Sequence, residues 1–400
     1  MPVTGPNTSF LTTDTNTGTT QDLGQRYVSI AYMMDVYPNL VPGMTSPGLW
    51  LYGDNQYGEL GQNNITNYSS PVQVGLLTNW KQVSAGYYST AAVKTDGTLW
   101  VWGRNAVGQL GNGTSTPYSS PIQVGALTTW KQVAGGWYHT AAIVTDGSMW
   151  ACGYNAKGQL GIGSTSNTNS PVMVGTLYNW KQVACGYHHT VAVKSDGTLW
   201  SCGYNNAGQL GQNHATNLSV QTQVGLLANW KQVACGYRHT VAVKTDGSLW
   251  SCGYNYYGQL GQNNTTSYSS PIQVGTLTNW KQVASKRAHT AAVKTDGTLW
   301  TWGYNGFGQL GNSSPFASLS SPVQVGTLTN WKQVECGNNH TVAIKTDGTL
   351  WGWGSTSVGQ LGNNAITPNY SSPVQIGTLT NWKSLSCGFN QTIAISDGYF

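Results

Sequence analysis

A repeat of 50 or 51 residues runs through most of this sequence and restricts the possible folds more than any other feature. Each unit contains two tryptophans in fixed surroundings, the first in segments such as Gly48–Gly53 and the second in segments such as residues 79–83. The first stands at Trp50, Trp100, Trp150, Trp200, Trp250, Trp300 and Trp351, and the second at Trp80, Trp130, Trp180, Trp230, Trp280, Trp331 and Trp382. A period of this length accommodates four short strands, which make one propeller blade. The repeat therefore predicts an all-β fold, with a seven-bladed β-propeller over residues 48–400 and an N-terminal extension over residues 1–47.

The composition agrees with a β protein. Charged residues make up 8% of the chain, against about 25% in an ordinary soluble domain, and Glu occurs only at Glu59 and Glu335. Helices draw on Glu, Lys and Arg for their exposed faces, so a mostly helical fold is not expected. No window approaches the roughly 18 apolar residues of a membrane span, and the N-terminus lacks the pattern of a secretory signal. We therefore expect no membrane insertion.

One unit shows the strands that we expect in each blade. Residues 90–95 alternate like a strand and are rich in small side chains, which suits the crowded position next to the central channel. The Asp-Gly dipeptide at 96–97 predicts a two-residue hairpin turn, and residues 98–103 form the return strand. We expect the third strand at residues 121–124 and the fourth, outermost strand at residues 130–133.

Two further expectations follow from this order of strands. Lys131 and its equivalents in the other units fall on the outermost strand, where a lysine discourages pairing with another chain. The chain stops after an inner strand at residues 392–400, whereas the array begins at Gly48 with a second strand. We expect one blade to combine three strands from residues 48–84 with the C-terminal strand, which closes the ring.

The units also resemble a known family. Residues 183–193, residues 196–203 and the Gly-Gln-Leu-Gly segment at 208–211 look like the repeats of the regulator of chromosome condensation (RCC1) family, and the resemblance covers residues 48–400. It implies a seven-bladed propeller, a fold that hosts exchange factors, a plant photoreceptor and secreted bacterial inhibitors. The constant period leaves no room for the inserted hairpin of the exchange factors, and only Trp137 matches the tryptophan cluster of the photoreceptor.

The polar residues that repeat have structural explanations. One His precedes Thr in five units, but Ser89 and Gln391 take its place in the first and last, which indicates a hydrogen bond rather than a metal site or a general base. The seven cysteines show no Cys-x-x-Cys spacing, so we expect buried free thiols and folding in a reducing cytoplasm. We find no set of residues with catalytic spacing. The sequence therefore predicts a protein that is not an enzyme and holds no metal or cofactor.

The charges that do not repeat are few. After the repeated Lys and Asp positions are set aside, the remaining basic residues are Arg26, Arg104, Lys157, Arg238, Lys286 and Arg287. Only the last two are adjacent, whereas a DNA-binding protein usually presents a clustered basic face. We therefore expect no nucleic-acid partner.

Function on a repeat scaffold is expected where the units differ. A variable pair precedes the His-Thr step and should surround the channel mouth on one face. The candidate partner-binding residues are Tyr87, Tyr88, Trp137, Tyr138, Tyr187, His188, Tyr237, Arg238, Lys286 and Arg287. Tyr, Trp and Arg dominate interface hot spots; the alternative is that these aromatics only pack between blades. The uncharged polar loops, such as residues 63–68, could bind a surface glycan or serve as neutral loops.

Residues 1–47 are polar at first and apolar from residue 27 onwards, which is typical of a docking arm. Its candidate docking residues are Tyr27, Tyr32, Met33, Met34 and Tyr37; the alternative is an arm that folds back on its own propeller. The arm and the uncharged surface favour a structural propeller of a bacteriophage virion, at the tail or capsid surface, attached to a virion structural protein. Its location would be the virion, or otherwise the cytoplasm or the extracellular space. The second hypothesis is a soluble regulator or inhibitor that binds one partner protein on the aromatic face.

Overall fold

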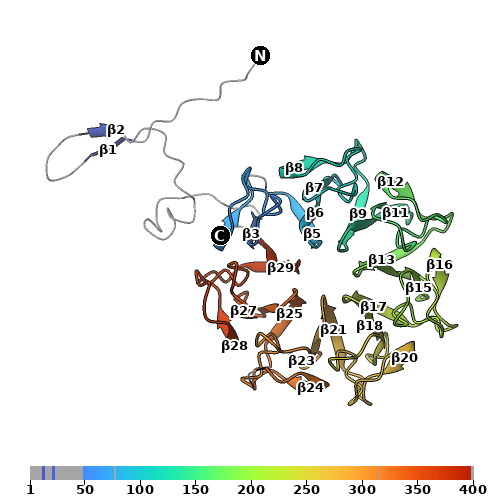
Figure 1. Cartoon of the computed structure of the whole chain (residues 1–400). Coiled ribbons are helices and arrows are strands. Elements are labelled where there is room, and N and C mark those ends of the chain that lie inside the picture. The colour runs from blue at the N-terminus through green and yellow to red at the C-terminus, as the bar shows by residue number, and fades with distance from the viewer. Residues whose placement is uncertain (1–10, 14–19, 23–47, 76–77, 315, 398–400) are drawn as a thin grey trace. The chain divides into compact units, whose positions relative to one another are not determined.

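Seven four-stranded antiparallel sheets stand in a ring in the computed structural model of the chain (Figure 1). The structure describes residues 11–13, 20–22, 48–75, 78–314 and 316–397. Every named element among them is a strand, and none is a helix that could cross a membrane. The predicted all-β, seven-bladed propeller is confirmed.

Each blade has the same four strands. Blade 1 consists of β5 (Trp80–Ala85), β6 (Ser89–Lys94), β7 (Leu99–Gly103) and β8 (Tyr118–Gln123). Blade 2 consists of β9 (Trp130–Gly135), β10 (His139–Val144), β11 (Met149–Gly153) and β12 (Thr168–Met173), and blade 3 of β13 (Trp180–Cys185), β14 (His189–Lys194), β15 (Leu199–Gly203) and β16 (Leu218–Gln223). Blade 4 consists of β17 (Trp230–Cys235), β18 (His239–Lys244), β19 (Leu249–Gly253) and β20 (Tyr268–Gln273), and blade 5 of β21 (Trp280–Ser285), β22 (His289–Lys294), β23 (Leu299–Gly303) and β24 (Leu319–Gln324). Blade 6 consists of β25 (Trp331–Cys336), β26 (His340–Lys345), β27 (Leu350–Gly354) and β28 (Tyr370–Gln375). Blade 7 consists of β29 (Trp382–Cys387), β30 (Gln391–Ser396), β3 (Gly48–Gly53) and β4 (Tyr68–Gln73).

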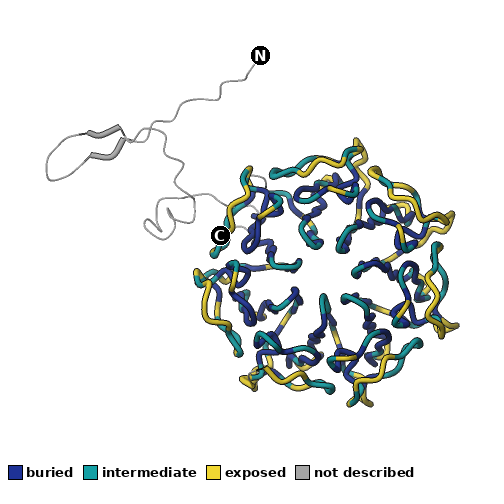
Figure 2. The backbone as a smooth tube through the Cα atoms, in the orientation of Figure 1, coloured by how far each residue is buried: buried dark blue, intermediate teal, exposed yellow. Residues whose placement is uncertain are grey.

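The predicted order of strands within a blade was wrong. The strand that begins with the second tryptophan is innermost, so β5, β9, β13, β17, β21, β25 and β29 face the channel (Figure 1). The alanine-rich β6 is the second strand and is buried along its whole length, because sheets of neighbouring blades cover both of its faces. The outermost β8 is largely half-buried, and exposure increases towards the rim (Figure 2).

Because of this order of strands, the repeated lysine lies at a different place in the blade than predicted. Lys131 lies on the innermost strand β9 and not on the rim. The prediction that it prevents an outer edge strand from pairing with another chain was therefore wrong. The small side chains of the second strand reflect tight packing between sheets, whereas the innermost strand borders the channel and tolerates Lys and Gln. Seven exposed lysines consequently lie on the innermost strands, at Lys81, Lys131, Lys181, Lys231, Lys281, Lys332 and Lys383.

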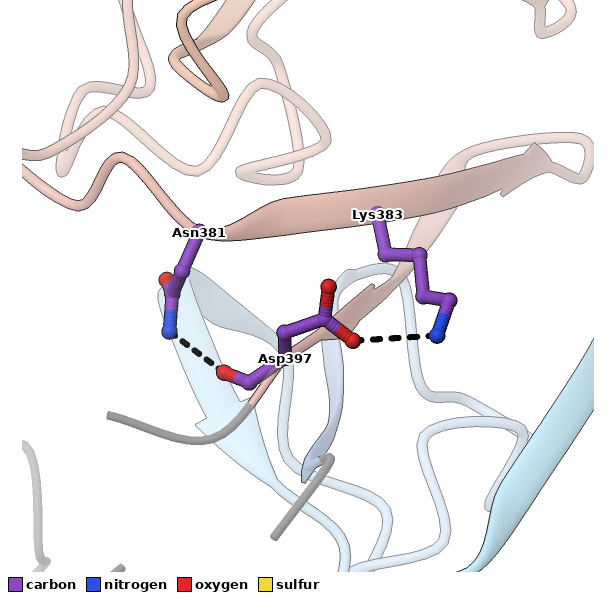
Figure 3. Close-up of polar contacts among 3 residues, drawn as sticks. All are labelled: Asn381, Lys383 and Asp397. Atoms are coloured by element: carbon purple, nitrogen blue, oxygen red, sulfur yellow. Dashed lines mark hydrogen bonds and ion pairs between the residues drawn. The ribbon is translucent and has the colours of Figure 1, made fainter. Parts of the chain in front are cut away.

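The two ends of the array close the ring in one blade, but with two strands each rather than three and one. β30 pairs with β3 along six residue pairs, from Gly48 opposite Ser396 to Gly53 opposite Gln391. Trp50 Nε1 also donates to Ser396 Oγ at 3.0 Å. At the end of β30, Asp397 forms an ion pair of 3.0 Å with Lys383, and its carbonyl accepts from Asn381 (Figure 3). The ring is therefore closed by a continuous β-ladder between the two ends of the propeller.

The repeated polar residues have the predicted structural roles. His139 Nε2 lies 2.9 Å from Thr190 Oγ1 of the next blade, and His340 Nε2 lies 3.0 Å from Thr392 Oγ1. Burial lowers the pKa of His139 to about 3, so the ring is neutral. All seven cysteines are buried and unpaired, as expected. No group of three or more potential metal ligands is found in the described parts of the chain.

The chain divides into two compact units, residues 1–43 and 44–400. In the first unit β1 (Leu11–Thr13) pairs with β2 (Thr20–Asp22) in an antiparallel ladder. The candidate docking residues of the arm lie outside the described residues; they are Tyr27, Tyr32, Met33, Met34 and Tyr37.

Candidate interaction surface at the channel mouth

The hairpin between the innermost and second strands brings the variable pair of each blade to one mouth of the channel. In blade 1, Gly86 N donates to Ser89 O at 2.8 Å and makes the hairpin tight. Tyr87 N then donates to Gly136 O of blade 2 at 3.2 Å, and the corresponding bond from Trp137 N reaches Gly186 O at 3.3 Å. Blades 4 and 6 make the same kind of bond, so four of the seven loops are fixed to the next blade by a backbone hydrogen bond.

Five of these loops supply an aromatic plate, which we define as Tyr87, Trp137, Tyr187, Tyr237 and Phe389. Trp137 is its centre: its ring centroid lies 4.2 Å from that of Tyr87, 4.5 Å from Tyr187, 4.9 Å from Tyr237 and 5.6 Å from Phe389. These partners belong to blades 1, 3, 4 and 7, so Trp137 reaches across the mouth. All five rings remain half-buried. The aromatics thus do pack on one another, as the alternative interpretation held, but they keep an exposed side.

A second set of rings surrounds the plate. Tyr88 lies 5.0 Å from Tyr57, and His188 lies 4.9 Å from Tyr154 and 6.0 Å from Tyr138. The loop after the third strand brings these residues close, because Tyr154 N donates to Tyr138 O at 2.8 Å. Sequence reasoning overlooked Tyr57 and Tyr154. The signal for Tyr154 was present in the Gly-Tyr-Asn segment that recurs at residues 153–155, 203–205, 253–255 and 303–305, whereas Tyr57 stands directly before the Gly-Glu-Leu-Gly turn.

Basic side chains lie over this second set of rings. The Arg104 guanidinium carbon lies 5.0 Å from the centroid of Tyr57 and 5.3 Å from that of Tyr138. Lys157 Nζ lies 5.7 Å, and the Arg238 guanidinium 5.4 Å, from the centroid of Tyr204. Such contacts hold a cation over an aromatic face while leaving it accessible.

The predicted residues of blade 5 lie in the same region. Arg287 Nη1 donates to Asn339 Oδ1 at 3.0 Å, and Lys286 Nζ donates to Ala85 O at 2.7 Å. Five of the six unrepeated basic residues therefore gather at this mouth, although most are far apart in the sequence; the sixth, Arg26, lies outside the described residues. A period close to 50 residues places distant positions on neighbouring blades, which adjacency in sequence does not reveal.

The acidic groups nearby have raised pKa values, and Glu59 stays largely protonated at neutral pH. Burial raises the pKa of the Glu59 carboxyl to about 8, and burial also raises the pKa of Asp54. Burial, with Lys157 and Arg238 nearby, lowers the pKa of His188 to about 4, so this imidazole is neutral. Among the described residues the only ion pair is Lys383–Asp397, on another strand end, so Arg104, Lys157 and Arg238 have no carboxylate partner. The aromatic face is consequently basic.

The sequence and the structure both match proteins of known fold. Residues 178–399 match the RCC1-like domain, and residues 48–93, 96–143 and 146–193 match the regulator of chromosome condensation (RCC1) repeat. The crystal structure of human WBSCR16 is 22% identical, covers 89% of this chain and 100% of its own, and superposes with a TM-score of 0.79. Yeast RCC1 (Prp20), in its structure bound to Kap60, is 19% identical over 92% of each chain, with a TM-score of 0.80. These two likenesses concern the fold alone. The chain belongs to the RCC1 repeat family.

Proposed function

We propose that this propeller is a non-catalytic interaction module, and that it binds a partner protein on the face formed by the aromatic plate and the surrounding cations. The observation that carries the proposal is the plate itself: five half-buried rings from five blades converge on one mouth. Trp, Tyr and Arg are the residues that contribute most to binding at protein interfaces. Rigid rings that are already in mutual contact lose little conformational freedom when a partner binds.

The charge of the face indicates the kind of partner. Arg104, Lys157 and Arg238 lie over tyrosine rings without a carboxylate partner among the described residues. An acidic protein surface would supply carboxylates to these cations and increase the rate of association. Yeast RCC1 (Prp20), which shares the fold, forms a complex with another protein, Kap60. We therefore propose a partner whose docking surface is acidic at its rim and apolar at its centre.

Charge reversal tests this function. The double variant Arg104→Glu and Arg238→Glu should lose the partner in co-purification from the native source, because like charges would then meet across the interface. The matched control, Lys131→Glu with Lys231→Glu, reverses two exposed charges on the innermost strands and should retain the partner. Equal recovery of the partner with both double variants would refute the proposed face. A partner that is lost only when residues 1–47 are removed would instead favour the assembly role that the sequence of the arm suggests.

A further inference from the structure

The central channel forms a cavity beneath the aromatic plate. Its volume is about 310 Å³, and the innermost strands of all seven blades line it. The plate lies at one mouth, and the innermost strands begin at the other, where each carries its exposed lysine. Ligand pockets in proteins start at roughly 300 Å³, so this cavity suits a small molecule.

Two residues inside the channel depart from the repeat. Lys286 stands where the other six blades have glycine, at Gly86, Gly136, Gly186, Gly236, Gly337 and Gly388. Glu335 stands where they have alanine or serine, at Ser84, Ala134, Ala184, Ala234, Ala284 and Ser386. Within the part of the chain that the structure describes, the cavity lining contains only these two charged residues and Lys81. Blades 5 and 6 thus place one cation and one acid at two positions where the other blades have uncharged residues.

Lys286 reaches across the channel. It belongs to the loop after β21 in blade 5, and its Nζ donates to the carbonyl of Ala85 in blade 1 at 2.7 Å. This bond uses one of the three hydrogen-bond donors of the ammonium group and leaves two. Lys286 is half-buried and lines the cavity, so the free donors are available to a molecule that occupies the channel.

Glu335 faces the same space without pairing with Lys286. Burial lowers the pKa of Lys286 and the nearby Glu335 partly offsets this effect, but no ion pair of 4.0 Å or less joins the two groups among the described residues. Burial raises the pKa of Glu335 to about 7 despite the nearby ammonium. A ligand with both an anionic and a cationic group could contact both residues at once, and such charge-assisted bonds are stronger than neutral ones.

The fold itself does not require the two charges. Neighbouring innermost strands are joined by glutamine side chains: Gln82 Nε2 donates to Val133 O, and Gln82 Oε1 accepts from Val133 N, both at 2.9 Å. The same pair of bonds joins Gln282 to Val334. Five blades have glycine and a small uncharged residue at the two positions, so closure of the ring does not depend on charged residues there.

We propose that the channel is a binding site for a small zwitterion of the amino-acid class. Its carboxylate accepts hydrogen bonds from the free donors of Lys286, and its ammonium group pairs with Glu335. The lysines at the open mouth attract anionic groups and so favour entry from that side. This site does not depend on the proposed protein interface, because the ligand lies within the ring of innermost strands.

Isothermal titration with three four-carbon acids tests the proposal. L-aspartate carries an amino group, L-malate a hydroxyl at the same carbon, and succinate neither. We expect L-aspartate to bind about tenfold or more tightly than succinate, because only aspartate offers an ammonium group to Glu335. Malate should fall between the two. Equal affinities for aspartate and succinate, or no binding of aspartate, would overturn the proposal.

The repeat supplies variants that should fold normally. Lys286→Gly and Glu335→Ala restore residues that other blades contain at these positions. Lys286→Gly should weaken aspartate binding by about tenfold or more, and Glu335→Ala should remove the preference for aspartate over succinate. Ala134→Ser is the control, because it changes the Glu335-equivalent position of blade 2 without altering the charge. Undiminished aspartate binding by Lys286→Gly, with an unchanged melting temperature, would show that the ligand does not use this lysine.

Discussion

Glu59 is a buried acid at a position where the other units have glutamine, and it makes the stability of the propeller depend on pH. The equivalent residues are Gln109, Gln159, Gln209, Gln259, Gln309 and Gln360. Glu59 is 0% exposed; its Oε2 accepts from Tyr57 N at 2.8 Å, and its Oε1 has no hydrogen-bond partner. In blade 1, Gln109 Oε1 accepts the corresponding bond from Val107 N at 3.1 Å. A protonated Glu59 side chain therefore accepts the same backbone hydrogen bond as the glutamine of blade 1 and, like it, carries no charge.

The magnitude follows from the pKa of this carboxyl. Burial raises it from an ordinary 4.5 to about 8 in the folded protein, and the charge of Asp54 adds to the effect. The folded state consequently binds a proton that the unfolded chain has already released, so stability is full below the unfolded pKa and falls as pH rises towards 8. Each unit of pKa shift corresponds to about 1.4 kcal/mol of stability. The free energy of unfolding is therefore lowered by up to about 5 kcal/mol at about pH 9 and by about 1 kcal/mol at about pH 5.

Glu59→Gln should remove this loss. We expect the variant to be more stable than the parent by several kcal/mol at about pH 9 and by at most about 1 kcal/mol at about pH 5, measured by chemical denaturation. The reciprocal variant Gln109→Glu should acquire a second but smaller pH-dependent loss of stability, because its site has the same hydrogen-bond geometry but Arg104 stands where the site of Glu59 has Asp54. A stability difference between Glu59→Gln and the parent that is the same at both pH values would refute the reasoning.

Three further predictions concern the plate, the closure and the packing of buried lysines. Trp137→Ala should weaken partner binding by about 2 kcal/mol or more, measured by titration, while circular dichroism stays that of a folded propeller; an unchanged affinity would contradict the role of the plate. Removal of residues 388–400 deletes β30 and leaves β3 paired only with β4, so we expect loss of soluble monomer in gel filtration. A truncation that keeps the parent melting temperature would contradict closure through this ladder. Lys244 Nζ lies 3.6 Å from the ring centroid of Trp250, so Lys244→Met should destabilise the fold by about 1 kcal/mol in denaturant titrations. The exposed control Lys231→Met should have little effect, and equal losses from the two would refute the cation–π contribution.

The sequence allowed the number of blades to be predicted but not the order of strands. Two tryptophans per unit define the period, and the period determines how many blades the ring contains. The alternation in residues 90–95 locates a strand, but a strand buried between two sheets and a strand beside a channel both contain small residues. Burial of β6 along its whole length distinguishes the two cases, and only the packed sheets reveal it. The same error moved Lys131 to the wrong edge.

Part of the candidate surface could also be predicted from the sequence. The variable pair lies at a fixed place in each hairpin, so the mouth position of Tyr87 and Trp137 could be predicted from their alignment within the repeat. The contacts of Arg104 and Lys157 could not, because they join side chains of adjacent blades that are far apart in the sequence. Clustering of basic residues in such a fold depends on their place within the unit rather than on their distance along the chain.

Site-specific photo-crosslinking is the measurement that tests the interaction role of the aromatic face most directly. A photoreactive phenylalanine analogue at Tyr138, beside the aromatic plate, is compared with the same residue at Lys181, an exposed position on an innermost strand. We expect one discrete protein adduct from position 138 and none from position 181. Adducts from neither position, or the same adducts from both, would contradict a specific partner on this face.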